Sequence, residues 1–134
     1  MLKKKLILAV LAAFFTVFLT DWIIHGMLLK GIYHETAYLW RTESEMQQHM
    51  HFMLGGQLIV AALFTIIFTK GYEKKGWTEG ARYGAYMAAL STGQMLICHA
   101  VSPYPLRLTL AWIVTCFVQF MVVGSVVAVV YSRK

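Results

Sequence analysis

Charged residues are scarce in this chain of 134 residues: they make up 13% of the sequence, whereas hydrophobic residues make up 59%. A soluble domain carries about 25% charged and about 45–50% apolar residues. This shortage of charge, with a mean hydropathy of +0.62, excludes a disordered tail, a coiled coil and an ordinary soluble domain. The length suits one domain, so the composition predicts a single polytopic membrane domain over residues 1–134.

Cysteines and catalytic motifs are also few. The two cysteines, Cys98 and Cys116, form no C-x-x-C pair, which argues against a disulfide framework or a thiol-redox motif. The sequence contains no phosphate-binding loop, nucleophile elbow or H-E-x-x-H motif. The Glu-x-x-His pattern of di-iron bundles is missing as well. We therefore predict a non-enzymatic protein with no catalytic residue.

Four apolar runs are each long enough to cross a bilayer core about 30 Å thick, which takes roughly 20 helical residues. None shows the period-2 alternation of a barrel strand, so they predict four transmembrane helices, at about 6–29, 43–69, 79–101 and 106–131. The first run also resembles a signal peptide. Because it continues as Asp21-Trp22-Ile23-Ile24-His25 instead of a small-residue cleavage site, we expect an uncleaved first helix.

The links between these runs predict how the helices pack. Residues 71–77 join the second run to the third, and Ser102-Pro103-Tyr104-Pro105 joins the third to the fourth and contains both prolines of the chain. Short links make sequential helices antiparallel neighbours. The expected fold class is therefore all-α, a four-transmembrane-helix bundle of up-down-up-down topology.

The longer link between the first two runs carries signals of its own. Tyr33, Tyr38 and Trp40 suit the headgroup layer of a membrane. Thr42-Glu43-Ser44-Glu45 matches a capping box, with Thr42 as the N-cap and Glu45 three residues into the helix. We therefore expect the second helix to start near Glu43 and to project beyond the bilayer.

The basic residues predict the direction of insertion. Lys30, Arg41 and Arg107 lie on one side, and the other nine lie at the two termini and the middle turn: Lys3, Lys4, Lys5, Lys70, Lys74, Lys75, Arg82, Arg133 and Lys134. The positive-inside rule then places both termini in the cytoplasm and argues against a dual-topology dimer. Because such clusters bind anionic headgroups, the net charge of +6 predicts a lipid bilayer as partner and no nucleic acid.

All five histidines fall on the external side of this topology. Asp21 and His25 are separated by four residues, as are Glu45 and His49, so each pair lies on one helix face. Together with His99 they form a candidate metal site, because carboxylate and imidazole suit zinc, iron, copper or manganese. His25 and His99 are the pair at similar depth that could hold haem b. The alternative is a set of interfacial histidines paired with neighbouring acids.

Asp21 is the sharpest single candidate. Counted from Leu6, it lies about 22 Å along a helix that crosses about 30 Å of hydrocarbon. A carboxylate at that depth costs a few kcal/mol and usually faces the interior of a bundle, so it marks a functional site by default. The alternative, which we weigh equally, is that Asp21 has a structural role: a bond to His25 that holds the first helix against its neighbours. Gln57, Gln94 and Gln119 in the other helices can hydrogen-bond between helices.

The third helix carries a small-residue step, Gly80-Ala81-Arg82-Tyr83-Gly84. Small residues four positions apart let membrane helices approach closely. We expect Gly80 and Gly84 to serve packing within the monomer, and hold a contact between two copies as the alternative.

Several stretches of the sequence resemble a known class of protein: Asp21-Trp22-Ile23-Ile24-His25-Gly26, Leu39-Trp40-Arg41, Glu45-Met46, Phe68-Thr69-Lys70-Gly71-Tyr72-Glu73 and Glu79-Gly80-Ala81-Arg82-Tyr83-Gly84. Over nearly its whole length the chain resembles the small bacterial four-helix integral membrane proteins that are grouped under domains of unknown function. The resemblance implies a four-span protein of the bacterial inner (cytoplasmic) membrane, and it supplies no activity.

Three functions remain open from the sequence. The leading one is an accessory or scaffolding subunit of a larger membrane complex, because the chain is short and leaves little mass outside the bilayer. Its partners are then other integral membrane subunits or a second copy. The first alternative is a periplasmic-side protein that binds a transition metal or haem b. The second is a small transporter in which Asp21 is the coupling acid.

Overall fold

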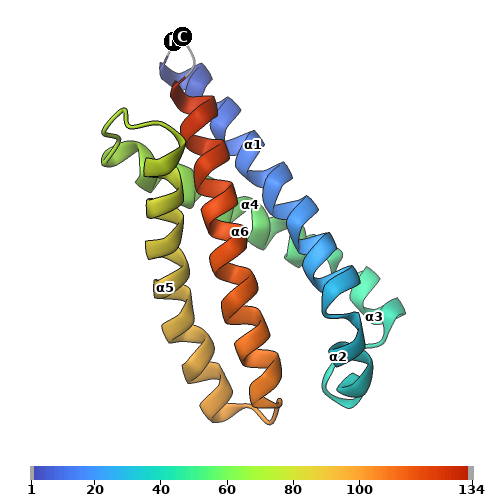
Figure 1. The fold of residues 1–134 in the computed structure, drawn as a ribbon. Helices are drawn as coiled ribbons and strands as arrows, with labels where there is room; N and C mark the ends of the chain where they lie inside the picture. The colour runs from blue at the N-terminus through green and yellow to red at the C-terminus, as the bar shows by residue number, and fades with distance from the viewer. Residues whose placement is uncertain (1, 133–134) are drawn as a thin grey trace.

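The computed structural model describes residues 2–132, and within this range it contains helices and no strand. Four long helices dominate: α1 (Leu2–Ile23), α4 (Met50–Lys70), α5 (Trp77–Val101) and α6 (Leu106–Ser132) (Figure 1). The all-α prediction is therefore confirmed.

Shorter helical pieces occupy the link between α1 and α4. A π-helical turn, η1 (Ile24–Leu28), extends α1 and is followed by α2 (Lys30–Glu35), a 3-10 turn η2 (Ala37–Leu39) and α3 (Glu43–Gln48). Thr42 and Glu45 form the expected capping box: the Thr42 N–H donates to the Glu45 carboxylate at 2.9 Å, and the Glu45 N–H donates to Thr42 Oγ1 at 3.4 Å. The helix expected over 43–69 is divided at His49, whose backbone leaves the helical conformation.

Three helical segments are long and apolar enough to cross a membrane: Lys3–Leu28, Met50–Lys70 and Leu106–Ser132. Helix α5 has a sufficient length of 25 residues. Its composition is less apolar, because Glu79, Arg82, Gln94 and His99 lie along it. A fourth span at α5 therefore stays a prediction.

Helix α6 lies at the centre of the packing, with α5 on one side and α1 on the other (Figure 1). Helix α4 packs mainly on α1, and its ring contacts with α5 and α6 lie in its second half, where Phe64 meets Tyr83 and Phe120. The buried core consists of small side chains with a few larger ones: Ala9, Ala13, Val17, Ala61, Phe64, Phe68, Val123, Val127 and Ala128. Small residues at helix contacts are typical of membrane helices, where close backbone packing drives association.

The closest helix contact is between α5 and α6. Gly80 and Gly84 of α5 face the backbone of α6 at Gly124 and Phe120, and a Cβ on any of the three glycines would clash with a facing carbonyl oxygen. The small-residue step of α5 is thus used within the chain.

The turn between α4 and α5 is organised by a buried carboxylate. Glu79 is only 4% exposed, and its two oxygens accept the backbone N–H groups of Glu73 at 2.6 Å and Lys75 at 2.8 Å. Lys74 and Gly76 adopt positive φ angles of 64° and 75°, which fold the chain back toward Glu79. The sequence alone does not reveal this role, because an acid in the first turn of a helix is equally typical of an exposed position.

Candidate functional site

Asp21 lies at the junction of three long helices. Its two carboxylate oxygens accept hydrogen bonds from the side-chain amides of Gln57 on α4, at 2.6 Å, and Gln119 on α6, at 2.7 Å. The Gln119 amide also donates to the Thr20 hydroxyl at 2.8 Å. Both glutamines are 8% exposed, so these bonds lie in the interior. Asp21 therefore connects α1 to α4 and to α6.

The sequence suggested that Gln57 and Gln119 bond between helices, but it did not reveal that Asp21 is their common acceptor. Neither the spacing within α1 nor that within α4 or α6 carries this information, because the contacts span 36 and 98 residues. An ionised carboxylate only accepts hydrogen bonds, and an amide NH₂ group supplies two donors, so the two groups match chemically. The amide oxygen Oε1 of Gln57 is buried and has no hydrogen-bond partner within residues 2–132.

A second polar chain starts at His25, one turn after Asp21. The His25 ring nitrogen Nε2 lies 3.8 Å from Asp21 Oδ1, and Nδ1 lies 2.6 Å from the Tyr33 hydroxyl. Trp112 of α6 donates its indole N–H to the same hydroxyl at 2.7 Å. Each proton has an acceptor if the Tyr33 hydroxyl donates to Nδ1 of His25. The neutral imidazole then carries its own proton on Nε2, which faces Asp21.

Tyr33 lies outside the membrane-spanning segments and stays protonated in this chain. Burial raises the pKa of its phenol and the charge of Asp21 raises it further, whereas the hydrogen bond from Trp112 lowers it. The hydroxyl therefore keeps the proton that it donates to His25.

Aromatic rings surround Tyr33 and hold the link between α1 and α4 against α6. Trp40 lies edge-on to Tyr33 at 5.7 Å between ring centroids and stacks on Tyr104 at 6.1 Å, and Tyr104 contacts Trp112 at 5.2 Å. From the sequence, Tyr33 and Trp40 were each expected in the headgroup layer. The cluster was not predicted, because its members come from two separate links and from α6.

The other predicted site residues point elsewhere. Glu45 is exposed, and hydrogen bonds from the Thr42 backbone and then its side chain lower the pKa of this carboxyl. His49 places Nδ1 at 2.8 Å from the backbone oxygen of Glu45, and His99 bonds to the Thr109 hydroxyl at 3.1 Å. Each group is thus engaged by a neighbour of its own.

Asp21, His25, Glu45, His49 and His99 therefore do not converge. Over the part of the chain that the structure describes, no three histidine, cysteine, aspartate or glutamate side chains lie close enough together to hold a metal ion. Asp21 and His25 form one pair and Glu45 and His49 another, and a pair supplies too few ligands for a stable protein metal site. A metal site of three or more such ligands thus has no geometric support within residues 2–132, and haem binding stays an untested prediction.

Comparisons with protein-family models, with curated proteins and with solved structures gave no match to this chain. The site is therefore interpreted from its geometry. It presents one carboxylate shared by two amides, and beside it an imidazole held by a phenol, an arrangement suited to joining helices through an apolar region.

Proposed function

We propose that this chain is a non-enzymatic integral membrane protein of the bacterial inner membrane that acts as an accessory or scaffolding subunit of a larger membrane complex. Helices α1, α4, α5 and α6 each cross the bilayer in alternating directions, and both termini lie in the cytoplasm. One observation carries the proposal: the interior polar groups are used to join the helices, while large apolar side chains cover the outside.

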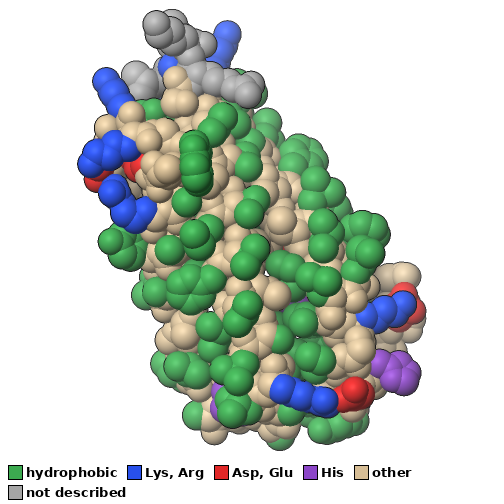
Figure 2. Space-filling model, in the orientation of Figure 1, with side chains coloured by type: hydrophobic (Ala, Val, Ile, Leu, Met, Phe, Trp, Pro, Cys, Tyr) green, Lys and Arg blue, Asp and Glu red, His purple; other side chains and the backbone are tan. Residues whose placement is uncertain are grey.

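The outer surface supports this proposal directly. Large apolar side chains are exposed along every long helix, for example Phe15 (59%), Ile59 (61%), Leu90 (71%) and Val114 (64%). Figure 2 shows one face of this apolar belt, with basic residues toward one end and histidines toward the other. Soluble monomers rarely expose apolar patches of more than a few hundred Å². Such a belt requires lipid or other membrane helices around it.

The geometry at Asp21 favours a structural role over transport. Both carboxylate oxygens are held by amides from neighbouring helices. A conduction path needs polar groups through the depth of the protein, whereas the half of α6 beyond Gln119 is almost entirely apolar.

The proposed orientation can be tested by cysteine labelling in spheroplasts. In a chain with both native cysteines replaced by alanine, we expect Tyr38→Cys to react with a membrane-impermeant maleimide in intact spheroplasts. Lys74→Cys should react only after permeabilisation, because the basic turn faces the cytoplasm. Tyr38 is 78% exposed, which makes it a suitable external control. Labelling of Lys74→Cys in intact spheroplasts would show that the insertion is inverted.

The proposed role can be tested by purification from native membranes in polymer-bounded lipid discs. We expect one or more other membrane polypeptides to elute with the tagged chain at a fixed ratio that mass photometry and quantitative proteomics both return. An unrelated tagged four-span protein serves as the control for carry-over of abundant membrane proteins. Recovery of a lone monomer in two independent polymers would refute the accessory role.

A further inference from the structure

Gln94 of α5 differs from the other two glutamines of the long helices. Gln57 and Gln119 are buried and bond across helices to Asp21. Gln94 is exposed, and within residues 2–132 its amide nitrogen donates to the Cys98 sulfur of the same helix, at 3.4 Å. Sulfur is a weak acceptor, and over the same range the Gln94 carbonyl accepts no hydrogen bond. Gln94 therefore keeps donor and acceptor capacity on the outside of α5.

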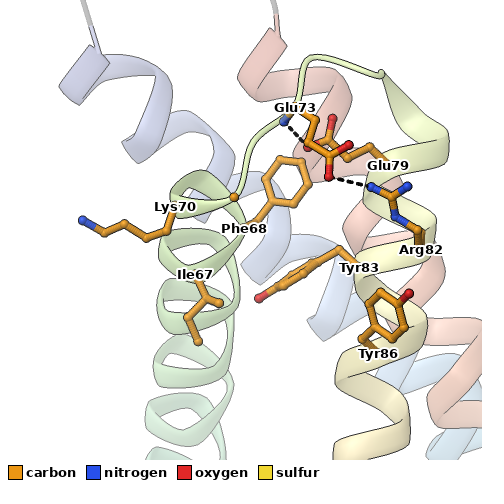
Figure 3. Close-up of a pocket in the computed structure, with 9 residues that line it drawn as sticks. Ile67, Phe68, Lys70, Glu73, Glu79, Arg82, Tyr83 and Tyr86 are labelled. Atoms are coloured by element: carbon orange, nitrogen blue, oxygen red, sulfur yellow. Dashed lines mark hydrogen bonds and ion pairs between the residues drawn. The ribbon is translucent and has the colours of Figure 1, made fainter.

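Helix α4 leaves this part of α5 uncovered. The two helices meet near the turn that joins them, where the Tyr83 hydroxyl donates to the Phe64 backbone oxygen at 2.8 Å and the Tyr83 ring packs against Phe68 (Figure 3). Gln94 lies about 16 Å further along α5, at 1.5 Å per residue. Between residues 50 and 60 of α4, Gln57 is buried and the others are exposed.

The depth of Gln94 makes its exposure costly. It lies about 10 Å before the end of α5 at Val101, at 1.5 Å per residue. If α5 crosses the bilayer, this position falls within the hydrocarbon. Lipid tails offer no hydrogen-bond partner to an amide. A second protein helix that carries a polar group at this depth would satisfy it.

Gln94 belongs to a stripe of exposed side chains with heptad spacing. Its members follow one another at intervals of four, three and four residues on one face of α5: Leu90 (71% exposed), Gln94, Ile97 (61%) and Val101 (79%). This spacing is that of the a and d positions of a coiled coil, and most membrane helices cross with the same left-handed geometry. A single polar side chain at an a position fixes the register and the number of helices.

We propose that this stripe is a self-association surface, on which α5 of one copy packs in parallel against α5 of a second copy. An amide is complementary to itself, because its NH₂ group donates to the carbonyl of a second amide while its own carbonyl accepts in return. Two copies inserted in the same direction, and related by a two-fold axis along the membrane normal, bring Gln94 to the same depth in both. Lipid could cover the apolar members of the stripe but could not satisfy the amide. The inference rests on the proposed crossing of α5, and it makes a second copy one partner within the scaffolding role.

Disulfide crosslinking in isolated membranes tests the surface, in the full chain with both native cysteines replaced by alanine. We expect Ile97→Cys and Val101→Cys to form linked dimers under mild oxidation, because equivalent positions of the stripe meet across the two-fold axis. Leu96→Cys is the matched control, since this neighbour is 48% exposed but points about 100° away from Ile97. Phe15→Cys on α1 (59% exposed) controls for random collision. Crosslinking of either control as fast as Ile97→Cys would overturn the surface.

Gln94→Leu in the Ile97→Cys chain separates the amide from the apolar part of the stripe. We expect crosslinking to fall about tenfold, which is what two hydrogen bonds between membrane helices are typically worth together. Gln94→Asn carries a shorter amide that is also self-complementary, and should retain most of the crosslinking. In dilute micelles, where the chain is monomeric, Gln94→Leu should leave the stability of the single chain unchanged. Undiminished crosslinking of Gln94→Leu would refute the inference.

The outcomes also separate this inference from the proposed function. An Ile97→Cys chain that reacts with the membrane-impermeant maleimide in intact spheroplasts would show that α5 does not cross the membrane. An Ile97→Cys chain that is neither labelled nor crosslinked would refute the second copy alone and leave the insertion in place. Crosslinked dimers from which no other polypeptide is recovered in lipid discs would refute the accessory role and leave the self-association standing.

Discussion

Replacing Gly124 with leucine is expected to unfold the contact between α5 and α6 and to give the largest loss of stability of any substitution considered. Even a single Cβ at Gly124 would clash with the backbone carbonyl oxygen of Gly80. The clash cannot be relieved by a rotamer change, because the contacting atoms belong to the backbone. Overpacking a fitted contact typically costs about 1–3 kcal/mol, and we expect Gly124→Leu to reach or exceed the upper end of that range. Gly124→Ala should be destabilising as well, by a smaller amount.

The measurement is reversible unfolding in mixed micelles, followed by the fluorescence of the four tryptophans. Gly93→Ala is the matched control: it lies on α5, and a Cβ there meets no atom within 4 Å. Because alanine is a better helix former than glycine, by about 1 kcal/mol, this control should be neutral or slightly stabilising. A Gly124→Leu chain that is as stable as the control would mean that α5 and α6 do not pack as described.

Asp21→Leu is expected to be the most destabilising change among the interior polar residues. It leaves the buried amides of Gln57 and Gln119 without their common acceptor. An unsatisfied buried polar group costs roughly 1–3 kcal/mol, so the loss of both bonds should lower the free energy of unfolding by about 2–3 kcal/mol. Asp21→Asn keeps one acceptor oxygen and should cost about half as much.

The triple variant Asp21→Leu/Gln57→Leu/Gln119→Leu separates a structural role from a chemical one. It removes the carboxylate and both amides together, so most of the stability lost through the unpaired amides should return, as expected when all partners become apolar. Gln94→Leu is the control, since within residues 2–132 the side-chain amide of Gln94 hydrogen-bonds to the Cys98 sulfur alone, at 3.4 Å. If Asp21→Asn were fully stable and also abolished a pH-dependent flux in proteoliposomes, Asp21 would be a coupling acid and the accessory role would be refuted.

Local sequence signals were sufficient for the fold class and for the helix that starts at Glu43. The apolar runs predicted all-α structure, because a backbone in lipid must satisfy its own hydrogen bonds within each segment. The Thr42 to Glu45 cap could be found for the same reason: its donors and acceptors lie three residues apart, in one turn of helix. The break at His49 was not found, since the sequence on both sides favours a helix.

The histidine site shows where such reasoning stops. Equal spacing correctly placed Asp21 near His25, but Glu45 and His49 do not join that pair to form one cluster. Glu45 turns back to its own N-cap, and His49 bonds to the backbone where α3 ends. The rotation of one helix about its axis relative to another is set by packing, which no single helix encodes.

The sequence by itself determined that this chain is helical and apolar, where its basic residues concentrate, and which glycines allow close packing. Only the tertiary structure decided that Gly80 meets Gly124 and that Asp21 is shared by Gln57 and Gln119. Hydropathy and capping act within one or two turns of the backbone. Pairing between helices depends on side-chain fit over distances of up to 98 residues along the chain, and becomes visible only once the helices have packed.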